Sequence, residues 1–235
     1  MFRFPLAASL GQCCGGIVEL WFQRYDADDL APLAEALRLR AEGAAPEAIA
    51  ALASRDPGAA RYECFSPQLT TLWLFGAGHV GRALVHVLAP LPFTVKWLDS
   101  REDPFPAALP ANVRAISTDD PAAEVTAMAA GDWALVLTHS HDEDFAICEA
   151  LLKHGQFDWA GVIGSMPKTK RFRQRLAQRG FTHADVARLT MPIGIGGIGS
   201  KEPAAIAVAV AAQLLQLREA NAAADEFPAR TRRES

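Results

Sequence analysis

The spacing of hydrophobic positions changes character near residue 70. From there on, short apolar runs alternate with longer segments whose apolar residues recur every three or four positions. Such runs are typical of buried strands, and such segments are typical of amphipathic helices. The expected strands span residues 71–75, 93–99, 112–116, 132–140 and 159–165, with a short sixth strand within 189–200. The expected helices span residues 79–90, 121–129, 143–155, 168–180 and 201–219. This alternation indicates βαβ units, and so an α/β fold with a Rossmann-like parallel sheet.

The part of the chain before residue 67 follows a different pattern. Residues 17–25 form a strand-like run, and residues 28–54 are rich in alanine and leucine. The second stretch predicts two helices that break near residues 43–46, with Asp28 or Asp29 as the N-cap. A small segment with a Cys-Cys strand turn and helices would thus precede the sheet. The expected divisions are an N-terminal region with its linker at 1–66, a Rossmann-like domain at 67–218 and a flexible tail at 219–235.

Composition and charge narrow the classes of function. Hydrophobic residues make up 50% and charged residues 21% of the 235 positions, a balance typical of globular proteins. The formal net charge of -4 argues against a general nucleic-acid binder, because such proteins carry a basic excess. No apolar run reaches the ~18 residues that span a membrane, and the start lacks the apolar stretch of a signal peptide. Since 4 cysteines do not make a disulfide scaffold, the expected location is the cytoplasm.

The clearest motif is FGAGHVG, in which Gly76, Gly78 and Gly81 match GxGxxG between an expected strand and an expected helix. In dinucleotide-binding folds the first glycine makes a tight turn, the second lets the backbone approach a diphosphate, and the third lets the helix pack on the strand. The helix that begins near His79 would offer free N–H groups to an anion. Asp99 ends the second strand, where an acid can bind a ribose hydroxyl. Alternatively, the glycines serve packing alone.

A second cluster, LTHSHDED, follows the fourth expected strand. Ligands of open parallel sheets bind outside the carboxyl ends of the strands, so His139 and His141 are candidates for metal binding or proton transfer. The cluster misses the HxHxDH motif of binuclear hydrolases, because Glu143 stands where an aspartate is required. The alternative is a helix N-terminus that Ser140 or Asp142 caps, with acidic residues in its first turn.

A third glycine-rich stretch, PIGIGGIGSKEP, precedes the last expected helix. It is not a Walker A loop, because Ser200 comes before Lys201. Backbone amides around Gly197 and Gly199, together with Lys201, could still cradle a phosphate. The alternative is a flexible turn in which Ser200 caps the helix. The basic segment 168–176 also has two interpretations, a solvated surface or a docking patch for an acidic partner.

Two adjacent cysteines, Cys13 and Cys14, stand between glycines in GQCCGG. Adjacent cysteines rarely form a disulfide with each other, because the bond needs Cα atoms about 5.5–6 Å apart. Glycines leave thiols exposed and let a ligand come close to the backbone, and a thiolate is both a nucleophile and a soft ligand. A glycine turn that leads into a strand would explain the glycines but not the two thiols.

The chain resembles the xanthine dehydrogenase accessory proteins, the XdhC/CoxI family, over about residues 10–217. The resemblance rests on five ordered motifs: GQCCGG, FGAGHVGRAL, LTHSHDEDF, VIGS followed by KTKRFRQRL, and PIGIGGIGSKEPAAIAVAVAAQLL. Members of this family are cytoplasmic chaperones of the molybdenum cofactor. They protect it while a cysteine desulfurase installs its terminal sulfur, and they deliver it to apo-xanthine dehydrogenase or a related molybdenum hydroxylase.

The resemblance implies a non-enzymatic chaperone rather than an enzyme. It implies that Cys13 and Cys14 are the thiol pair near the cofactor, where a thiolate would hold the molybdenum transiently or shield its sulfido ligand. It also implies that the glycines of FGAGHVG form the Rossmann turn. The phosphate end of the cofactor would lie at residues 76–81 or 194–199. Two alternatives stay open: an NAD(P)-dependent oxidoreductase, suggested by the glycine motif and Asp99, and a structural partner of the dehydrogenase that binds no ligand. A homodimer is compatible with each. The family usually has a glycine-rich segment before the cysteine motif, whereas only ten residues precede Gly11 here. The resemblance therefore leaves three alternatives open: a truncation, a misassigned start or a shortened variant.

Overall fold

The computed structural model describes residues 2–5, 17–20, 26–41 and 69–226. The chain divides into two compact units, Met1–Ser66 and Pro67–Ser235. Within the first unit, β1 (Phe2–Pro5) pairs antiparallel with β2 (Ile17–Leu20), and α2 spans Leu30–Ala41. Cys13 and Cys14 lie outside the described residues, as does the helix expected after residue 46.

The first helical segment begins differently from the expectation. Asp26 is the N-cap of a 3-10 turn, η1 (Ala27–Asp29), which leads directly into α2. The Asp26 carboxylate accepts a hydrogen bond from the N–H of Asp28 at 3.2 Å, and the Asp29 carboxylate accepts one from the N–H of Asp26 at 2.7 Å. The prediction of Asp28 or Asp29 as the N-cap was therefore wrong, because this reciprocal capping box starts the turn at an earlier aspartate.

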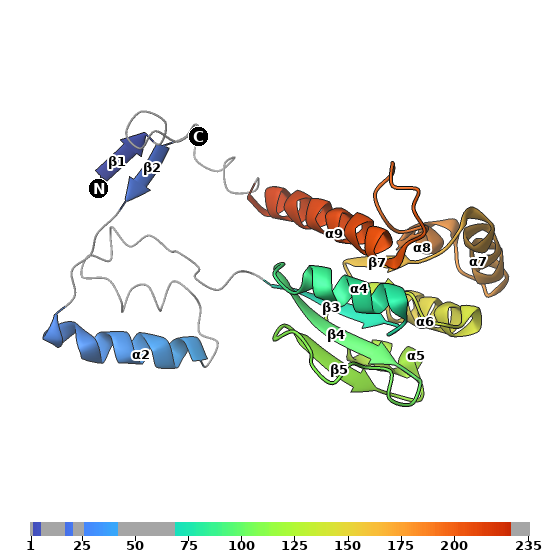
Figure 1. Cartoon of the computed structure of the whole chain (residues 1–235), viewed down its shortest axis with the longest axis horizontal. Coiled ribbons are helices and arrows are strands. Elements are labelled where there is room, and N and C mark those ends of the chain that lie inside the picture. Colours follow the sequence, from blue (N-terminus) through green and yellow to red (C-terminus); the bar gives the residue numbers. More distant parts are fainter. Residues whose placement is uncertain (1, 6–16, 21–25, 42–68, 227–235) are drawn as a thin grey trace. The chain divides into compact units, whose positions relative to one another are not determined.

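A six-stranded parallel sheet forms the centre of the second unit (Figure 1). Its order is β5-β4-β3-β6-β7-β8, which is the order of doubly wound dinucleotide-binding folds. The strands are β3 (Thr70–Phe75), β4 (Phe93–Asp99), β5 (Val113–Ser117), β6 (Trp133–Val136), β7 (Trp159–Val162) and β8 (Leu189–Thr190). The predicted α/β class and parallel sheet are confirmed. Because all neighbours are parallel, the six carboxyl ends share one edge, and the strand order reverses between β3 and β6.

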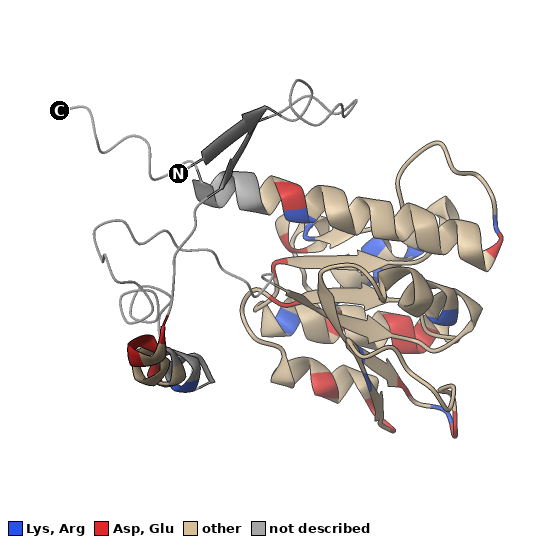
Figure 2. Cartoon of the chain, turned by 60° about the vertical axis from the view of Figure 1, so that its left-hand side comes forward, with Lys and Arg blue, Asp and Glu red and all other residues tan. Residues whose placement is uncertain are grey.

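Helices cover both faces of the sheet (Figure 1). Successive side chains of β3 point to opposite faces of the sheet, so the core has two parts. Leu72 and Leu74 face one helical layer, whereas Trp73 and Phe75 face the other. The first layer consists of α4 (His79–Leu88) and α9 (Pro203–Glu226), which pack on each other. The second layer consists of α5 (Pro121–Glu124), α6 (His141–His154), α7 (Met166–Gln178) and α8 (His183–Ala187). Figure 2 shows that α9 is free of charged residues over most of its described length.

Several element ends differ from the expected ones. α5 stops at Glu124 and continues as a 3-10 turn, η2 (Val125–Ala127), and α8 was not expected. α6 and α7 each begin two residues earlier than predicted, because Ser140 and Ser165 are their N-caps. α9 continues into the segment expected to be a tail. Among the described helices, none is long and apolar enough to cross a membrane.

Candidate functional site

The glycine turn after β3 touches the loop after β6 where the strand order reverses. Gly76 has a φ of +119°, and a Cβ atom at this position would overlap the carbonyl group of Leu137 and lie 2.9 Å from the Cα atom of Thr138. A Cβ atom at Gly81 would overlap the carbonyl oxygen of Gly76. The first and third glycines of the motif are therefore required for turn, loop and helix to pack this closely.

The middle glycine of the motif has no such packing role. Gly78 has a φ of -72°, which any residue can adopt, and a Cβ atom there would meet no atom within 4 Å. It is the N-cap of α4, and within the described part of the chain no side chain caps the first turn of this helix. His79, the first helical residue, is exposed. The N-terminus of α4 thus presents backbone N–H groups and a positive helix dipole to open space, which suits an anionic oxygen.

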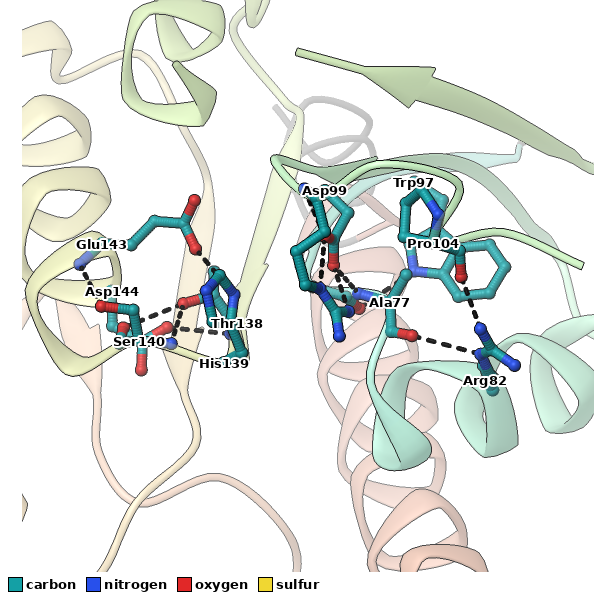
Figure 3. A network of polar contacts seen from close by, with 12 residues as sticks. Ala77, Arg82, Trp97, Asp99, Pro104, Thr138, His139, Ser140, Glu143 and Asp144 are labelled. Carbon is teal, nitrogen blue, oxygen red and sulfur yellow. Dashed lines mark hydrogen bonds and ion pairs between the residues drawn. The ribbon is translucent and has the colours of Figure 1, made fainter. Parts of the chain in front are cut away.

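The loop after β6 is held by a short chain of hydrogen bonds (Figure 3). The Thr138 hydroxyl donates to the Ser140 carbonyl at 2.9 Å, and the Thr138 N–H donates to the Asp144 carboxylate at 2.9 Å. The Ser140 hydroxyl accepts from the N–H of Glu143 at 3.4 Å, which confirms Ser140 as the N-cap of α6. The loop is therefore fixed in position beside the glycine turn.

The two predicted histidines differ in their surroundings. The Nδ1 atom of His139 lies 3.6 Å from a carboxylate oxygen of Glu143, and the His139 side chain is half exposed (Figure 3). His141 is the exposed first residue of α6. Among the described residues, no group of three or more histidine, cysteine, aspartate or glutamate side chains is arranged to hold a metal ion. The contact that the structure gives His139 is therefore with the Glu143 carboxylate of the same helix end.

Asp99, at the carboxyl end of β4, is buried and fully engaged. One carboxylate oxygen accepts hydrogen bonds from the N–H and the Nε atom of Arg101, at 3.0 and 2.8 Å. The other accepts from the N–H of Ala77 at 2.5 Å and from Nη2 of Arg101 at 2.8 Å. Asp99 thereby joins the end of β4 to the glycine turn.

The hydrogen bonds to Asp99 also set its acidity. Burial alone would raise the pKa of this carboxyl, but the hydrogen bonds from Arg101 and from the N–H of Ala77 outweigh burial and lower the pKa to about 2. A carboxyl with a lowered folded-state pKa contributes stability above its unfolded-state pKa of about 3.9 and loses it as the pH falls through its folded-state pKa. The sensitive range is therefore pH ~4 to ~2.

We expect the charge of Asp99 to contribute about 1–2 kcal/mol to the free energy of unfolding above pH ~4, a value discounted because solvent screens the partly exposed Arg101. The measurement is the free energy of unfolding from pH 6 to pH 2 for the parent and for Asp99→Asn. The parent should lose about this much more than the variant on acidification. Parallel pH profiles would show that Asp99 is not the titrating group.

A buried ion pair, which sequence analysis did not identify, lies next to this loop. Nζ of Lys168, at the start of α7, donates to the Asp144 carboxylate at 2.5 Å and to the carbonyl of Ile163 at 2.8 Å. The Asp144 side chain is fully buried and that of Lys168 is 9% exposed. The pair joins two of the recognised motifs, LTHSHDED and KTKRFRQRL. The pair connects α6, α7 and the residue that follows β7, next to the Thr138–Ser140 segment.

The third glycine-rich stretch follows β8 at the same edge of the sheet. The N–H of Gly194 donates to the side chain of Gln213 at 2.7 Å, which anchors the beginning of the stretch to α9. Gly197, Gly199 and Lys201 are all exposed. Among the described residues, no hydrogen bond joins these three to the glycine turn or to the loop after β6. The structure thus brings two of the three predicted motifs into direct contact.

Comparison with known proteins places this arrangement in a family. The model of the XdhC Rossmann domain matches residues 72–214. The uncharacterized protein YqeB of Escherichia coli (strain K12) is 30% identical over 148 residues, which cover 63% of this chain and 27% of YqeB. A xanthine dehydrogenase from Bacillus halodurans, solved at 2.80 Å, superimposes with a TM-score of 0.55 at 27% identity, over 65% of this chain and 43% of that one. The chain thus spans less than half of either relative, and it belongs to the XdhC Rossmann domain family.

Proposed function

We propose that the chain serves the maturation of xanthine dehydrogenase or a related molybdenum hydroxylase, as a chaperone that binds the molybdenum cofactor and delivers it to the apo-enzyme. Membership of the XdhC family and the likeness to the Bacillus halodurans protein support this role. The observation that carries the proposal is Gly78. A glycine without a packing role, at an uncapped helix N-terminus where the strand order reverses, is suited to a phosphate group.

The cofactor is cargo in this proposal, and the described residues fit its anionic end. The N–H groups at the start of α4 would hold the phosphate, while His139 and Glu143, across the Gly76–Leu137 contact, would hydrogen-bond to polar parts of the ligand. We propose Cys13 and Cys14, which lie outside the described residues, as the thiols that contact the molybdenum. A cysteine desulfurase would supply the terminal sulfur while the chaperone shields the cofactor.

The oxidoreductase alternative is not favoured by the surroundings of Asp99. NAD-dependent enzymes with this fold use the acid at the end of the second strand to bind the ribose of the dinucleotide. Here that acid already accepts four hydrogen bonds from Ala77 and Arg101. The other alternative is a structural partner of the dehydrogenase that binds no ligand. It differs from the proposed chaperone in carrying no cofactor, so the cofactor content of the purified protein distinguishes the two functions.

Gly78→Val should reduce retention of the cofactor at least tenfold, because the new side chain fills the space that a phosphate must enter. The fold should be unaffected, since an added Cβ atom meets no neighbour within 4 Å. The measurement is the pterin content per folded molecule after purification from a molybdenum-replete host, followed by transfer to apo-xanthine dehydrogenase.

Gly199→Val is the matched control, because a Cβ atom at Gly199 also meets open space but the residue belongs to the other glycine-rich stretch. A variant with Cys13→Ser and Cys14→Ser tests the metal end and should deliver less cofactor at equal folded protein. Loss with Gly199→Val but not with Gly78→Val would move the phosphate to residues 194–199. A parent protein that carries no pterin and transfers none would contradict the chaperone function.

A further inference from the structure

The carboxylate at the end of β4 has no acceptor capacity left. An ionised carboxylate offers about four lone-pair positions for hydrogen bonds. Asp99 receives four bonds, three of them from Arg101 and one from the N–H of Ala77. A ribose hydroxyl, which the acid at this place binds in dinucleotide enzymes, would have to displace one of these donors. Bonds between a guanidinium group and a carboxylate are about twice as strong as neutral ones, so the exchange is unfavourable.

The charge of Arg101 is already balanced by Asp99, which makes Arg101 a weak partner for a second phosphate. In related folds an arginine near this strand end accommodates the 2′-phosphate of NADP. The pocket beside Arg101, of about 490 Å³, is lined by Ser100, Arg101, Glu102, Asp103, Ser117, Thr118 and Asp119. Three carboxylates thus stand against one guanidinium group, which itself is already bound to Asp99. A phosphate in this pocket would meet an excess of negative charge.

We propose that Arg101 is a specificity residue, because it occupies the oxygens of Asp99 that would otherwise bind a ribose. The site then accepts ligands that carry a phosphate but place no nucleoside next to the end of β4. The proposal rests on the proposed function in so far as the same glycine turn holds the phosphate. It adds the class of ligand, because both NAD and NADP are excluded by the side chains at the ends of β4 and β5. The Arg101 side chain is 40% exposed, so its removal opens no cavity in the core, whereas Asp99 loses its cation.

The test is a calorimetric titration of the full chain with ADP-ribose, NAD and NADP. Arg101→Ala frees one acceptor position on each oxygen of Asp99, so ADP-ribose and NAD should bind at least tenfold more tightly than they bind to the parent. NADP should gain less, because its 2′-phosphate still meets the carboxylates of the pocket. Arg101→Met, which keeps the aliphatic stem, serves as a second variant if Arg101→Ala fails to fold.

Arg114→Ala is the matched control, because Arg114 is an exposed arginine on the adjacent strand β5 and lies outside the Asp99 network. It removes the same charge and should leave nucleotide affinity unchanged. Adding Asp99→Asn to Arg101→Ala should cancel the gain. Equal nucleotide affinity in parent and Arg101 variants, or an equal gain with Arg114→Ala, would overturn the proposal. The pterin content of the parent tests the proposed function separately, so the two can fail independently.

Discussion

Gly76→Ala is expected to lower the free energy of unfolding by roughly 3–5 kcal/mol. Two separate causes add up. The φ of +119° at Gly76 is strained for any residue with a Cβ atom, and that atom would overlap the backbone of Leu137. A backbone carbonyl that follows a buried strand cannot move aside as a flexible side chain can, so β3 and β6 would have to shift.

Gly78→Ala, two residues further along the same turn, provides the matched comparison. It makes the same chemical change, but at a φ of -72° and with no atom within 4 Å of the added methyl group. Its effect should stay below about 1 kcal/mol, as is usual for a substitution away from packed features. Urea denaturation followed by circular dichroism measures both. If the Gly76→Ala variant were as stable as the Gly78→Ala variant, the close contact between the glycine turn and the loop after β6 would be contradicted.

The layered architecture could be predicted because each strand and helix carries its own pattern. Leu72, Trp73, Leu74 and Phe75 form an apolar run too short for a helix, and both faces of the strand they form are covered. The motif GxGxxG then located the turn. Spacing alone, however, assigned all three glycines the same importance. The need for a glycine at Gly76 depends on the carbonyl group of Leu137, which is distant in the sequence. The need at Gly81 depends on the conformation that brings the Gly76 carbonyl oxygen against it, and Gly78 opens onto free space.

The surroundings of Asp99 show a second limit of sequence reasoning. The motif rule placed an acid at the end of the second strand, and the structure has it there. Whether that acid is available to a ligand depends on the rotamer of Arg101. Its side chain turns back to bind the Asp99 carboxylate, two residues earlier in the sequence. Local sequence does not fix this choice, because an arginine in a loop points to solvent as readily as to a neighbouring carboxylate.

Lys168 was interpreted as part of a basic, solvated helix or a docking patch, yet it is buried. A signal was present in the helical spacing, since Lys168 stands four and eight residues before Phe172 and Leu176, both of which are fully buried. Its partner Asp144 resembled any acid in the first turn of a helix. Neither residue by itself indicates burial, and their pairing arises only when α6 and α7 pack side by side.

Lys168→Met should therefore destabilise the domain by about 3–5 kcal/mol, because it leaves the buried Asp144 carboxylate without its cation. Methionine has nearly the length of the lysine stem, so lost volume is not the cause, and the contact of Nζ with the Phe172 ring is lost together with the charge. The comparison is Lys170→Met on the exposed side of the same helix, which should change the free energy of unfolding by less than about 0.5 kcal/mol. Urea denaturation of the full chain measures both variants.

A double variant separates the charge from the shape of this pair. Asp144→Asn retains an oxygen that can accept the hydrogen bond from the N–H of Thr138, but it removes the negative charge. Combined with Lys168→Met it leaves no buried ion, so the double variant should be more stable than the sum of the single effects predicts, by about 2 kcal/mol. Additive effects would mean that the two charges do not stabilise each other.

The position of the loop after β6 gives the pair a role beyond stability. Asp144 binds Lys168 with one oxygen and the N–H of Thr138 with the other, so the ion pair also orients the segment that carries His139. In Lys168→Met an unpaired carboxylate is drawn toward water, and the Thr138 N–H should lose its protection from hydrogen exchange. In the double variant the amide group that replaces the Asp144 carboxylate should restore that protection along with stability. If exchange at Thr138 is the same in parent and Lys168→Met, the pair stabilises the helices without positioning the loop.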